Sequence, residues 1–261
     1  MLGLAKSTYY RKAGMDKAGG RLERRIEVLS LKHPRYGYRM ITELLRAEGW
    51  KVNRKRVQRI RRRDDLQVVT KARKTKRKAL SQPPRDRARR ANEVWSYDFI
   101  HDRLENGAAL KMLTVLDEFT RECLGILVAR SITASGVIGF LDLLVLQRGA
   151  PGNVRSDNGP EFVADVVKEW AQQQAIQTNY LEPGSPWENG HVESFHGKFR
   201  DECLNREVFG NLLEAKVLVE QWRKQYNNKR PHSSLGYRTP REFARQFSSK
   251  LRVATLPSAS S

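Results

Sequence analysis

Apolar residues in the first quarter of the chain recur every three or four positions, in three short segments. Pro34 and Gly49 separate these segments, since neither residue continues a helix well. Asn53 stands where the third segment needs an N-terminal cap. The pattern therefore predicts three short helices. Their apolar positions are Leu22, Ile26 and Leu29 in the first, Ile41, Leu44 and Leu45 in the second, and Val57 and Ile60 in the third.

From residue 93 the pattern changes to short apolar or alternating runs, separated by turn residues such as Asn106 and Gly107. The first three runs lie close enough together to form an antiparallel meander, and helical and extended segments alternate after them. This order predicts an α/β fold with a mixed five-stranded sheet and flanking helices. The predicted strands are 94–100, 109–116, 122–129, 153–155 and 176–180, with helices at 133–147 and 160–174.

Two more helices are predicted after the fifth strand. Residues 185–188, Ser-Pro-Trp-Glu, combine a capping box with proline at the first helical position, so a helix is expected to begin there and to run to about Cys203. The next helix covers 212–226. The predicted core residues are Val192, Phe195, Phe199 and Cys203 in the first of these helices, and Leu213, Val217 and Trp222 in the second.

Residues 70–92 have almost no large apolar side chains and many basic ones, so they cannot pack a core and are interpreted as a basic linker. The sequence accordingly predicts a helical, helix-turn-helix-like region at 1–69 and the linker at 70–92. A second domain with C-terminal helices follows at 93–247, and a flexible tail at 248–261.

The composition excludes several classes of protein. Apolar runs are far shorter than the roughly 20 residues that a bilayer span requires, so no membrane partner is expected. The first residues lack the apolar core of a secretion signal, which favours the cytoplasm. Cys123 and Cys203 are the only cysteines, too few for a disulfide scaffold or a cysteine-rich zinc module, and we expect them to be buried thiols.

The positive charge is concentrated in the first third of the chain. Residues 1–92 contain 29 Lys and Arg against 8 Asp and Glu, a net charge of +21, whereas residues 93–261 have a net charge of −1. Charge alone is compatible with a ribosomal or membrane-surface role. The third helix, however, follows a glycine-containing turn and has seven basic residues in ten positions, which favours contact with DNA. These residues, predicted to face outward, are Arg54, Lys55, Arg56, Arg59, Arg61, Arg62 and Arg63.

Three acidic residues stand out in the second part of the chain. Asp98 lies within a predicted strand between aromatic residues, Asp157 directly follows the fourth strand, and Glu193 lies beside the core face of a helix. Such carboxylates could converge on hard divalent cations, Mg²⁺ or Mn²⁺, and two such ions can promote phosphodiester cleavage. Arg200, seven residues after Glu193, falls on the same helical face and could contact a phosphate.

The chain resembles the DDE transposases and integrases, and specifically the OrfB catalytic product of bacterial insertion sequences of the IS three family. The resemblance rests on 35 residues between Asp157 and Glu193 and on five motifs that span nearly the whole chain. These motifs are 33–39 (HPRYGYR), 95–99 (WSYDF), 156–162 (SDNGPEF), 183–200 (PGSPWENGHVESFHGKFR) and 226–236 (YNNKRPHSSLG).

This resemblance implies that residues 93–247 form an RNase H-like catalytic core with C-terminal helices, in an enzyme that cuts element ends and joins the 3′-OH to DNA. It also implies a location in the bacterial cytoplasm, in association with the nucleoid. It implies that Asp98, Asp157 and Glu193 bind two divalent ions, Mg²⁺ or Mn²⁺, and that Arg200 is the trailing basic residue. The expected partners are terminal inverted repeats, target DNA, an upstream OrfA segment and further copies of the chain. A zinc module is not implied.

Two other functions remain open at this point. A non-catalytic DNA-binding regulator would use only the helix-turn-helix region, and a hydrolase of the same fold would cut RNA or branched DNA without joining. Asp117 is interpreted as a turn-forming residue between the second and third strands. His191 and His196 are either helix-surface residues or DNA contacts.

Overall fold

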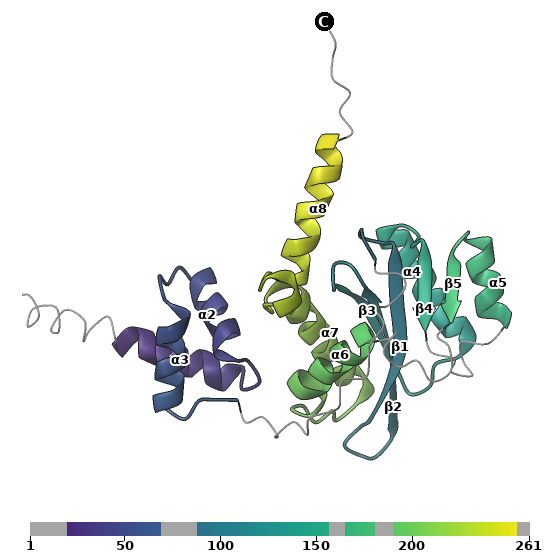
Figure 1. The fold of residues 1–261 in the computed structure, drawn as a ribbon. Helices are drawn as coiled ribbons and strands as arrows, with labels where there is room; N and C mark the ends of the chain where they lie inside the picture. Colours follow the sequence, from purple (N-terminus) through teal and green to yellow (C-terminus); the bar gives the residue numbers. More distant parts are fainter. Residues whose placement is uncertain (1–19, 69–87, 157–164, 181–189, 255–261) are drawn as a thin grey trace, which may run out of the picture. The chain divides into compact units, whose positions relative to one another are not determined.

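The computed structural model describes residues 20–68, 88–156, 165–180 and 190–254 (Figure 1). The chain divides into two compact units, Met1–Lys76 and Arg77–Ser261. The predicted helix starts at 160 and 185–188 lie outside the described residues, and so does Asp157. No helix in the described part of the chain is both long and apolar enough to cross a membrane.

The described residues of the first unit, 20–68, form three helices, as the apolar spacing predicts. They are the helix at 20–32, α2 (Tyr38–Ala47) and α3 (Arg54–Arg63). The side chain of Asn53 caps α3 by accepting a hydrogen bond of 2.9 Å from the backbone N–H of Lys55. Gly49, with φ of +87°, makes the turn after α2. All three helices contribute to one apolar core, which includes Ile26, Leu45 and Val57.

Arg61 corrects one part of this prediction. Its guanidinium is buried, with Nη1 donating a 2.8 Å hydrogen bond to the carbonyl of Tyr36 and Nη2 donating to the carbonyl of Leu66. The physical reason is helical spacing, because Arg61 lies one turn after Val57 and therefore shares its buried face. Arg61 ties α3 to the segment before α2 and to the segment that follows α3, and it does not face outward.

The second unit is built on a mixed five-stranded sheet with the strand order β3-β2-β1-β4-β5. β2 pairs with β1 and with β3 in antiparallel orientation. β4 pairs in parallel with β1, and β5 pairs in parallel with β4, which confirms the predicted fold class. Gly107, with φ of +80°, lies in the β1–β2 connection, where the sequence predicts a tight turn. The strands are β1 (Val94–Arg103), β2 (Ala109–Asp117), β3 (Cys123–Ala129), β4 (Asn153–Ser156) and β5 (Gln177–Tyr180).

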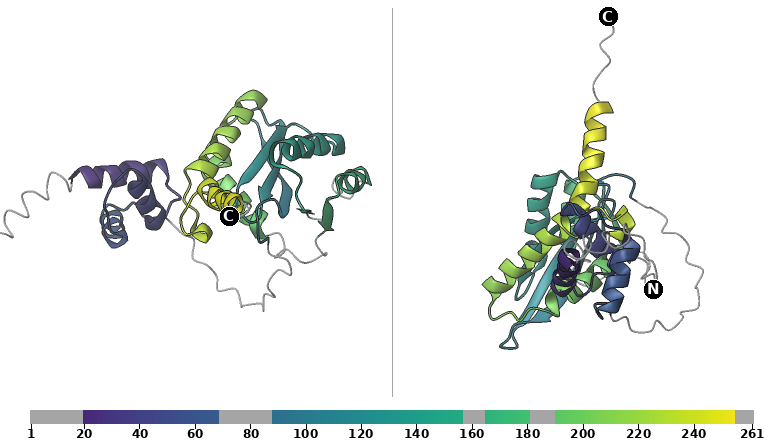
Figure 2. Two further views of the ribbon diagram at one scale, coloured as in Figure 1. Left: turned by 90° about the horizontal axis from the view of Figure 1, so that it is seen from above. Right: turned by 90° about the vertical axis from the view of Figure 1, so that its left-hand side faces the viewer.

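Helices cover both faces of this sheet, which lies between them in Figure 2. On one face α4 (Ala134–Arg148) and α5 (Asp165–Gln173) pack against a cluster that contains Trp95 and Tyr97. On the other face lie α6 (Gly190–Phe199) and α7 (Leu212–Asn228). A single π-helical turn (Arg200–Leu204) extends α6, and α8 (Pro240–Ala254) continues into the segment predicted as a tail.

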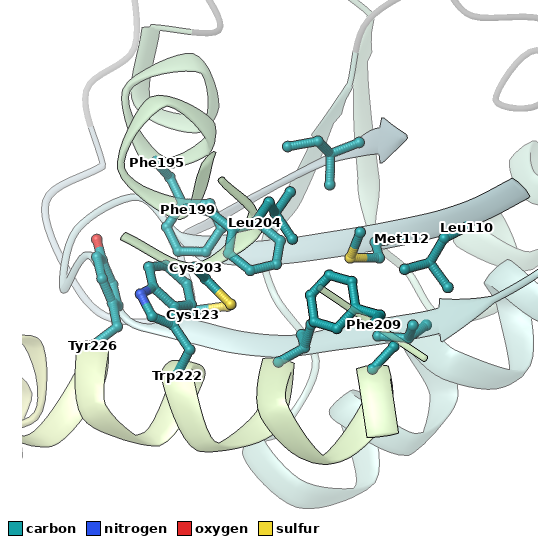
Figure 3. Packing of buried hydrophobic residues seen from close by; sticks show 14 of the residues in the cluster. Leu110, Met112, Cys123, Phe195, Phe199, Cys203, Leu204, Phe209, Trp222 and Tyr226 are labelled. Carbon is teal, nitrogen blue, oxygen red and sulfur yellow. The ribbon is translucent and has the colours of Figure 1, made fainter. Parts of the chain in front are cut away.

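Aromatic side chains dominate the core between the sheet and α6 and α7 (Figure 3). Phe195 contacts Trp222 and Tyr226 edge-on, with ring centroids 5.5 and 5.1 Å apart. Cys123 and Cys203 are buried free thiols in the same core, as predicted. This core fixes α6 against the sheet.

The predicted core face of α7 is wrong for two of three residues. Leu213 is 72% exposed and Val217 is 47% exposed, whereas Trp222 is buried. Ala215, Val219 and Tyr226 share the buried face with Trp222. Apolar residues occur on more than one side of this helix, so composition alone does not indicate which side meets the sheet.

Candidate active site

Asp98 lies on the face of β1 that meets α6. Side chains alternate along a strand, and the two neighbours Tyr97 and Phe99 pack on the α4 side of the sheet. Ile100, two residues after Asp98, packs in the core beneath α6. The strand therefore presents the Asp98 carboxylate toward the helix that carries Glu193.

The Asp98 carboxylate is held by its own strand and faces a histidine from α6. Its Oδ1 accepts a 2.6 Å hydrogen bond from the backbone N–H of Phe99. Its Oδ2 lies 3.5 Å from Nδ1 of His196, and the two side chains are only 21% and 14% exposed. Asp98 is thus a partly buried carboxylate in a defined orientation.

His196 connects α6 to both central strands. Its Nε2 lies 2.8 Å from the hydroxyl of Thr114, the residue of β2 that is paired with Asp98. The same hydroxyl donates a 3.1 Å hydrogen bond to the carbonyl of Asp98, so Thr114 contacts both partners of the His196–Asp98 pair. Burial and the charge of Arg200 lower the pKa of His196 to about 4, which favours the neutral ring at pH 7.

Glu193 lies on α6, three residues before His196, and its side chain is exposed. Residues three apart lie on one side of a helix, so Glu193 is on the side of α6 from which His196 reaches Asp98. The structure thus brings Asp98 and the Glu193 segment together. Asp157 lies outside the described residues and directly follows Ser156, the last residue of β4. Among the described residues, no three His, Cys, Asp or Glu side chains form a group suited to a metal ion.

Arg200 begins the π-helical turn after α6 and is exposed. Its Nη2 donates a 3.4 Å hydrogen bond to the carbonyl of His101 on β1. Because its charge lowers the pKa of His196, the guanidinium lies near the side of α6 that faces Asp98. Arg200 therefore lies close to β1 and His196, and its contact with a phosphate stays a prediction.

A buried ion pair that the sequence analysis missed supports the end of β4. Nη1 of Arg155 donates to both carboxylate oxygens of Glu118, at 3.1 and 3.0 Å, and the hydroxyl of Ser96 also donates to Glu118. Ser96 is paired with Arg155 between β1 and β4. These three residues join β1, β4 and the turn after β2 just before Asp157. The sequence contained a signal for this ion pair, because Glu118 directly follows the apolar run of β2 and Arg155 lies in the run of β4.

Asp117 has the turn-forming role predicted for it. Its Oδ1 accepts a 2.7 Å hydrogen bond from the backbone N–H of Thr120, and its Oδ2 accepts one of 2.7 Å from that of Asn92. Arg121, with φ of +63°, completes the turn into β3. Both oxygens of Asp117 thus bind backbone, which separates its role from that of Asp98.

Comparison with known proteins identifies the family. The chain is 39% identical over 247 residues to an uncharacterized 39.2 kDa protein of insertion element IS476 from Xanthomonas euvesicatoria, covering 95% of this chain and 71% of that protein. It is 38% identical over 244 residues to an uncharacterized 31.7 kDa protein of insertion element IS407 from Burkholderia multivorans, covering 94% and 88%. Transposase InsD of insertion element IS2 from Escherichia coli is 29% identical, with 82% and 74% covered.

The chain belongs to the insertion-element transposases of the IS three family. Residues 88–186 and 174–240 match two models described as integrase core domain, and residues 20–74 match one described as HTH-like domain. Among solved structures, one in a simian T-cell lymphotropic virus intasome is similar at a TM-score of 0.52 and 15% identity. That alignment covers 91% of this chain and 76% of the viral chain. This similarity supports the integrase-core fold of the second unit.

Proposed function

We propose that this transposase cuts the ends of its insertion element and joins the resulting 3′-OH to target DNA, in reactions that require divalent cations. The observation that carries the proposal is the partly buried Asp98, which β1 presents toward the helix of Glu193. A carboxylate within a strand is costly to bury unless it has a partner or a ligand. The family supports the same conclusion, since its members include transposases.

The donor set fits Mg²⁺ or Mn²⁺ better than zinc. Asp98 and Glu193 offer carboxylate oxygens, and Asp157 would add a third carboxylate, whereas Cys123 and Cys203 are buried elsewhere in the core. Two bound ions would supply activation of the attacking oxygen and stabilisation of the leaving oxygen.

The protein itself would orient the reacting DNA strand. His196 and the hydroxyl of Thr114 fix the backbone and side chain of Asp98. The ion pair of Glu118 and Arg155 holds β4 against β1, so the carboxyl end of β4 lies beside the segment of β1 that leads to Asp98. Arg200 would contact a phosphate next to the scissile bond.

The first unit would supply most of the DNA affinity. Lys55, Arg59 and Arg62 on α3 are exposed, while Arg54 and Arg56 are half-buried and Arg54 also forms a 2.8 Å ion pair with Glu43. With Arg61 excluded, these five residues are the proposed contacts to DNA phosphates or bases. Terminal inverted repeats, target DNA, an OrfA segment and further copies of the chain are the proposed partners.

Single substitutions of the three acidic residues test the proposal. Asp98→Asn, Asp157→Asn and Glu193→Gln keep the shape of each side chain but remove a charged oxygen ligand. We expect each to abolish 3′-end cleavage and joining in Mg²⁺ or Mn²⁺, because groups that act as a unit fail together. A gel shift on the same DNA and a thermal melt should stay close to those of the unsubstituted protein.

Glu207→Gln is the matched control, because Glu207 is another exposed glutamate of the same unit, beyond the π-helical turn. This variant should cleave and join normally. Near-normal joining by a folded, DNA-binding Glu193→Gln protein would refute the metal-binding triad and favour a DNA-binding regulator. Cleavage without any joining in the unsubstituted protein would favour the hydrolase.

A further inference from the structure

A second polar site lies on the other side of α6. A cavity of about 340 Å³ opens between α6, the turn after β2 and the segment that follows α7. Its polar side chains include Arg121, His191, Ser194, Lys198, His232 and Ser234. The segment after α7 belongs to the motif at 226–236, to which the proposed catalytic site assigns no role.

The geometry of α6 separates this cavity from the proposed catalytic residues. A helix advances about 100° per residue, so Ser194 and Lys198 project from one flank of α6. Glu193, His196 and Arg200 project from the opposite flank. The core residues between the two flanks, such as Phe195 and Phe199, hold the helix on the sheet. α6 therefore carries two distinct polar sites.

The cavity is positively charged in spite of containing one carboxylate. Asp117 lines it, but both Asp117 oxygens accept backbone hydrogen bonds. Arg121 and Lys198 supply two cations to the same walls. Burial, followed by the charges of Lys198, Arg230 and Arg121, lowers the pKa of His232 to about 3. Burial, followed by the charge of Arg230, lowers the pKa of Lys198 to about 8, while Glu202 acts in the opposite direction, so Lys198 is still mostly charged at pH 7.

The donors at the cavity suit an anion with several oxygens. Nζ of Lys198 donates to the carbonyl and to the hydroxyl of Ser194, at 2.8 and 2.6 Å. An ammonium group has three donors, and the described part of the chain shows acceptors for two of them. Ser234, whose hydroxyl lies 2.9 Å from Nδ1 of His232, adds a polar group on the opposite wall.

We propose that this cavity binds a backbone phosphate of DNA at a distance from the reacting one, with Lys198 and Arg121 as the principal contacts. The proposal rests on the proposed transposase function in one respect, namely that the bound polyanion is DNA. A phosphodiester carries one negative charge and two free oxygens, which match a cationic cavity with hydroxyl groups. Because Lys198 and Glu193 are on one helix, a phosphate held here would also fix the catalytic flank of α6.

Binding measurements on the full chain test this site without relying on catalysis. The affinity for a short mixed-sequence duplex is measured by fluorescence anisotropy across a range of salt concentrations, with EDTA present so that no DNA is cut. Lys198→Gln should weaken binding roughly tenfold and reduce the slope of log K against log salt by about one unit. Lys198→Arg keeps the positive charge and should therefore retain most of the slope of log K against log salt.

Lys216→Gln is the matched control, because Lys216 is an exposed lysine on α7 and does not line the cavity. It should leave both affinity and slope unchanged. A thermal melt shows whether Lys198→Gln is folded. An unchanged salt slope in the folded Lys198→Gln protein would overturn the proposal.

The rate at which an amine-reactive reagent acylates Lys198, read by peptide mass spectrometry, provides an independent measurement on the unsubstituted protein. Duplex DNA should slow this reaction, while polyglutamate and inorganic phosphate at equal ionic strength should slow it much less. Protection by polyglutamate but not by DNA would overturn the proposal in favour of an acidic protein partner. Equal protection by inorganic phosphate and DNA would overturn it in favour of a free-anion site.

These outcomes are distinguishable from failure of the proposed function. The cleavage assay depends on Asp98, Asp157 and Glu193, whereas the salt slope and the acylation of Lys198 are measured without metal ions. A protein that fails to join DNA can still show the expected slope and protection.

Discussion

Nδ1 of His196 lies 3.5 Å from the carboxylate of Asp98, and the two residues join α6 to β1 where the proposed chemistry takes place. The opposite nitrogen of the ring reaches the hydroxyl of Thr114 on β2. The side chain of His196 thus fixes the position of α6, the helix of Glu193, relative to β1 and β2. This makes His196 a positioning residue, since it acts through Asp98.

Replacing His196 should affect joining more than folding. His196→Ala removes the contact to Asp98 and one hydrogen bond of Thr114, so we expect a loss of about 1–3 kcal/mol in the free energy of unfolding. Joining at 20 °C, where the variant remains folded, should fall much further because Asp98 is no longer held. Unfolding by urea and joining rates under one buffer measure both effects. A fall in joining that a matched core variant such as Val219→Ala reproduces would contradict the positioning role.

Breaking the buried ion pair should destabilise the second unit. Glu118 and Arg155 have side chains that are only 2% and 8% exposed. Removing one partner of a buried pair leaves an uncompensated charge, so Glu118→Gln should cost about 3–5 kcal/mol. The exposed pair of Arg63 and Glu23 provides the comparison, since water screens its charges and Glu23→Gln should cost much less than Glu118→Gln. Chemical unfolding of the two variants checks the contrast, and equal losses would contradict it.

Replacing Gly125 or Gly139 by alanine should change the stability of the protein in opposite directions. A Cβ at Gly125 on β3 would lie 2.6 Å from Cζ of Phe140, so Gly125→Ala should destabilise the protein by about 1–3 kcal/mol. A Cβ at Gly139 within α4 would meet nothing within 4 Å. Gly139→Ala should therefore stabilise the helix by about 0.5–1 kcal/mol. Thermal melts of both variants test the pair, and a shift of the same sign in both would refute the packing argument.

The free energy of unfolding should decrease in acid because His232 has a lowered pKa in the folded protein. Burial lowers the pKa of His232 from 6.5 to about 3, so the unfolded chain binds a proton that the native state does not bind between these values. The contribution of His232 is fully present above pH 6.5 and is lost as the pH falls toward 3, by at most about 1.4 kcal/mol per pH unit. Unfolding by urea at several pH values measures the slope. The His232→Asn protein should show a shallower slope, and an unchanged slope would contradict the assignment.

Local rules were enough to predict most of the elements. Asn53 caps α3 because its side chain can accept from a nearby backbone N–H, and the alternating run around Asp98 forms a strand because alternate residues must face opposite sides of the sheet. The order of three extended runs followed by alternating helices and strands predicted the mixed sheet. The buried face of α6 followed from its apolar spacing.

Other features depended on contacts between distant segments. The buried guanidinium of Arg61 requires the carbonyl of Tyr36, which is 25 residues away in the chain, to be within reach. Helical spacing left two candidate faces for α7, and only docking on the sheet selected the one with Ala215 and Val219.

The sequence by itself therefore determined which segments form helices and strands and which acidic residues are candidates for catalysis, because backbone propensity and side-chain alternation act over a few residues. The tertiary structure decided that His196 meets Asp98, that Glu118 pairs with Arg155, and that a cationic cavity forms behind α6. Distances between side chains on different elements depend on how the whole core packs, and no local pattern encodes that packing.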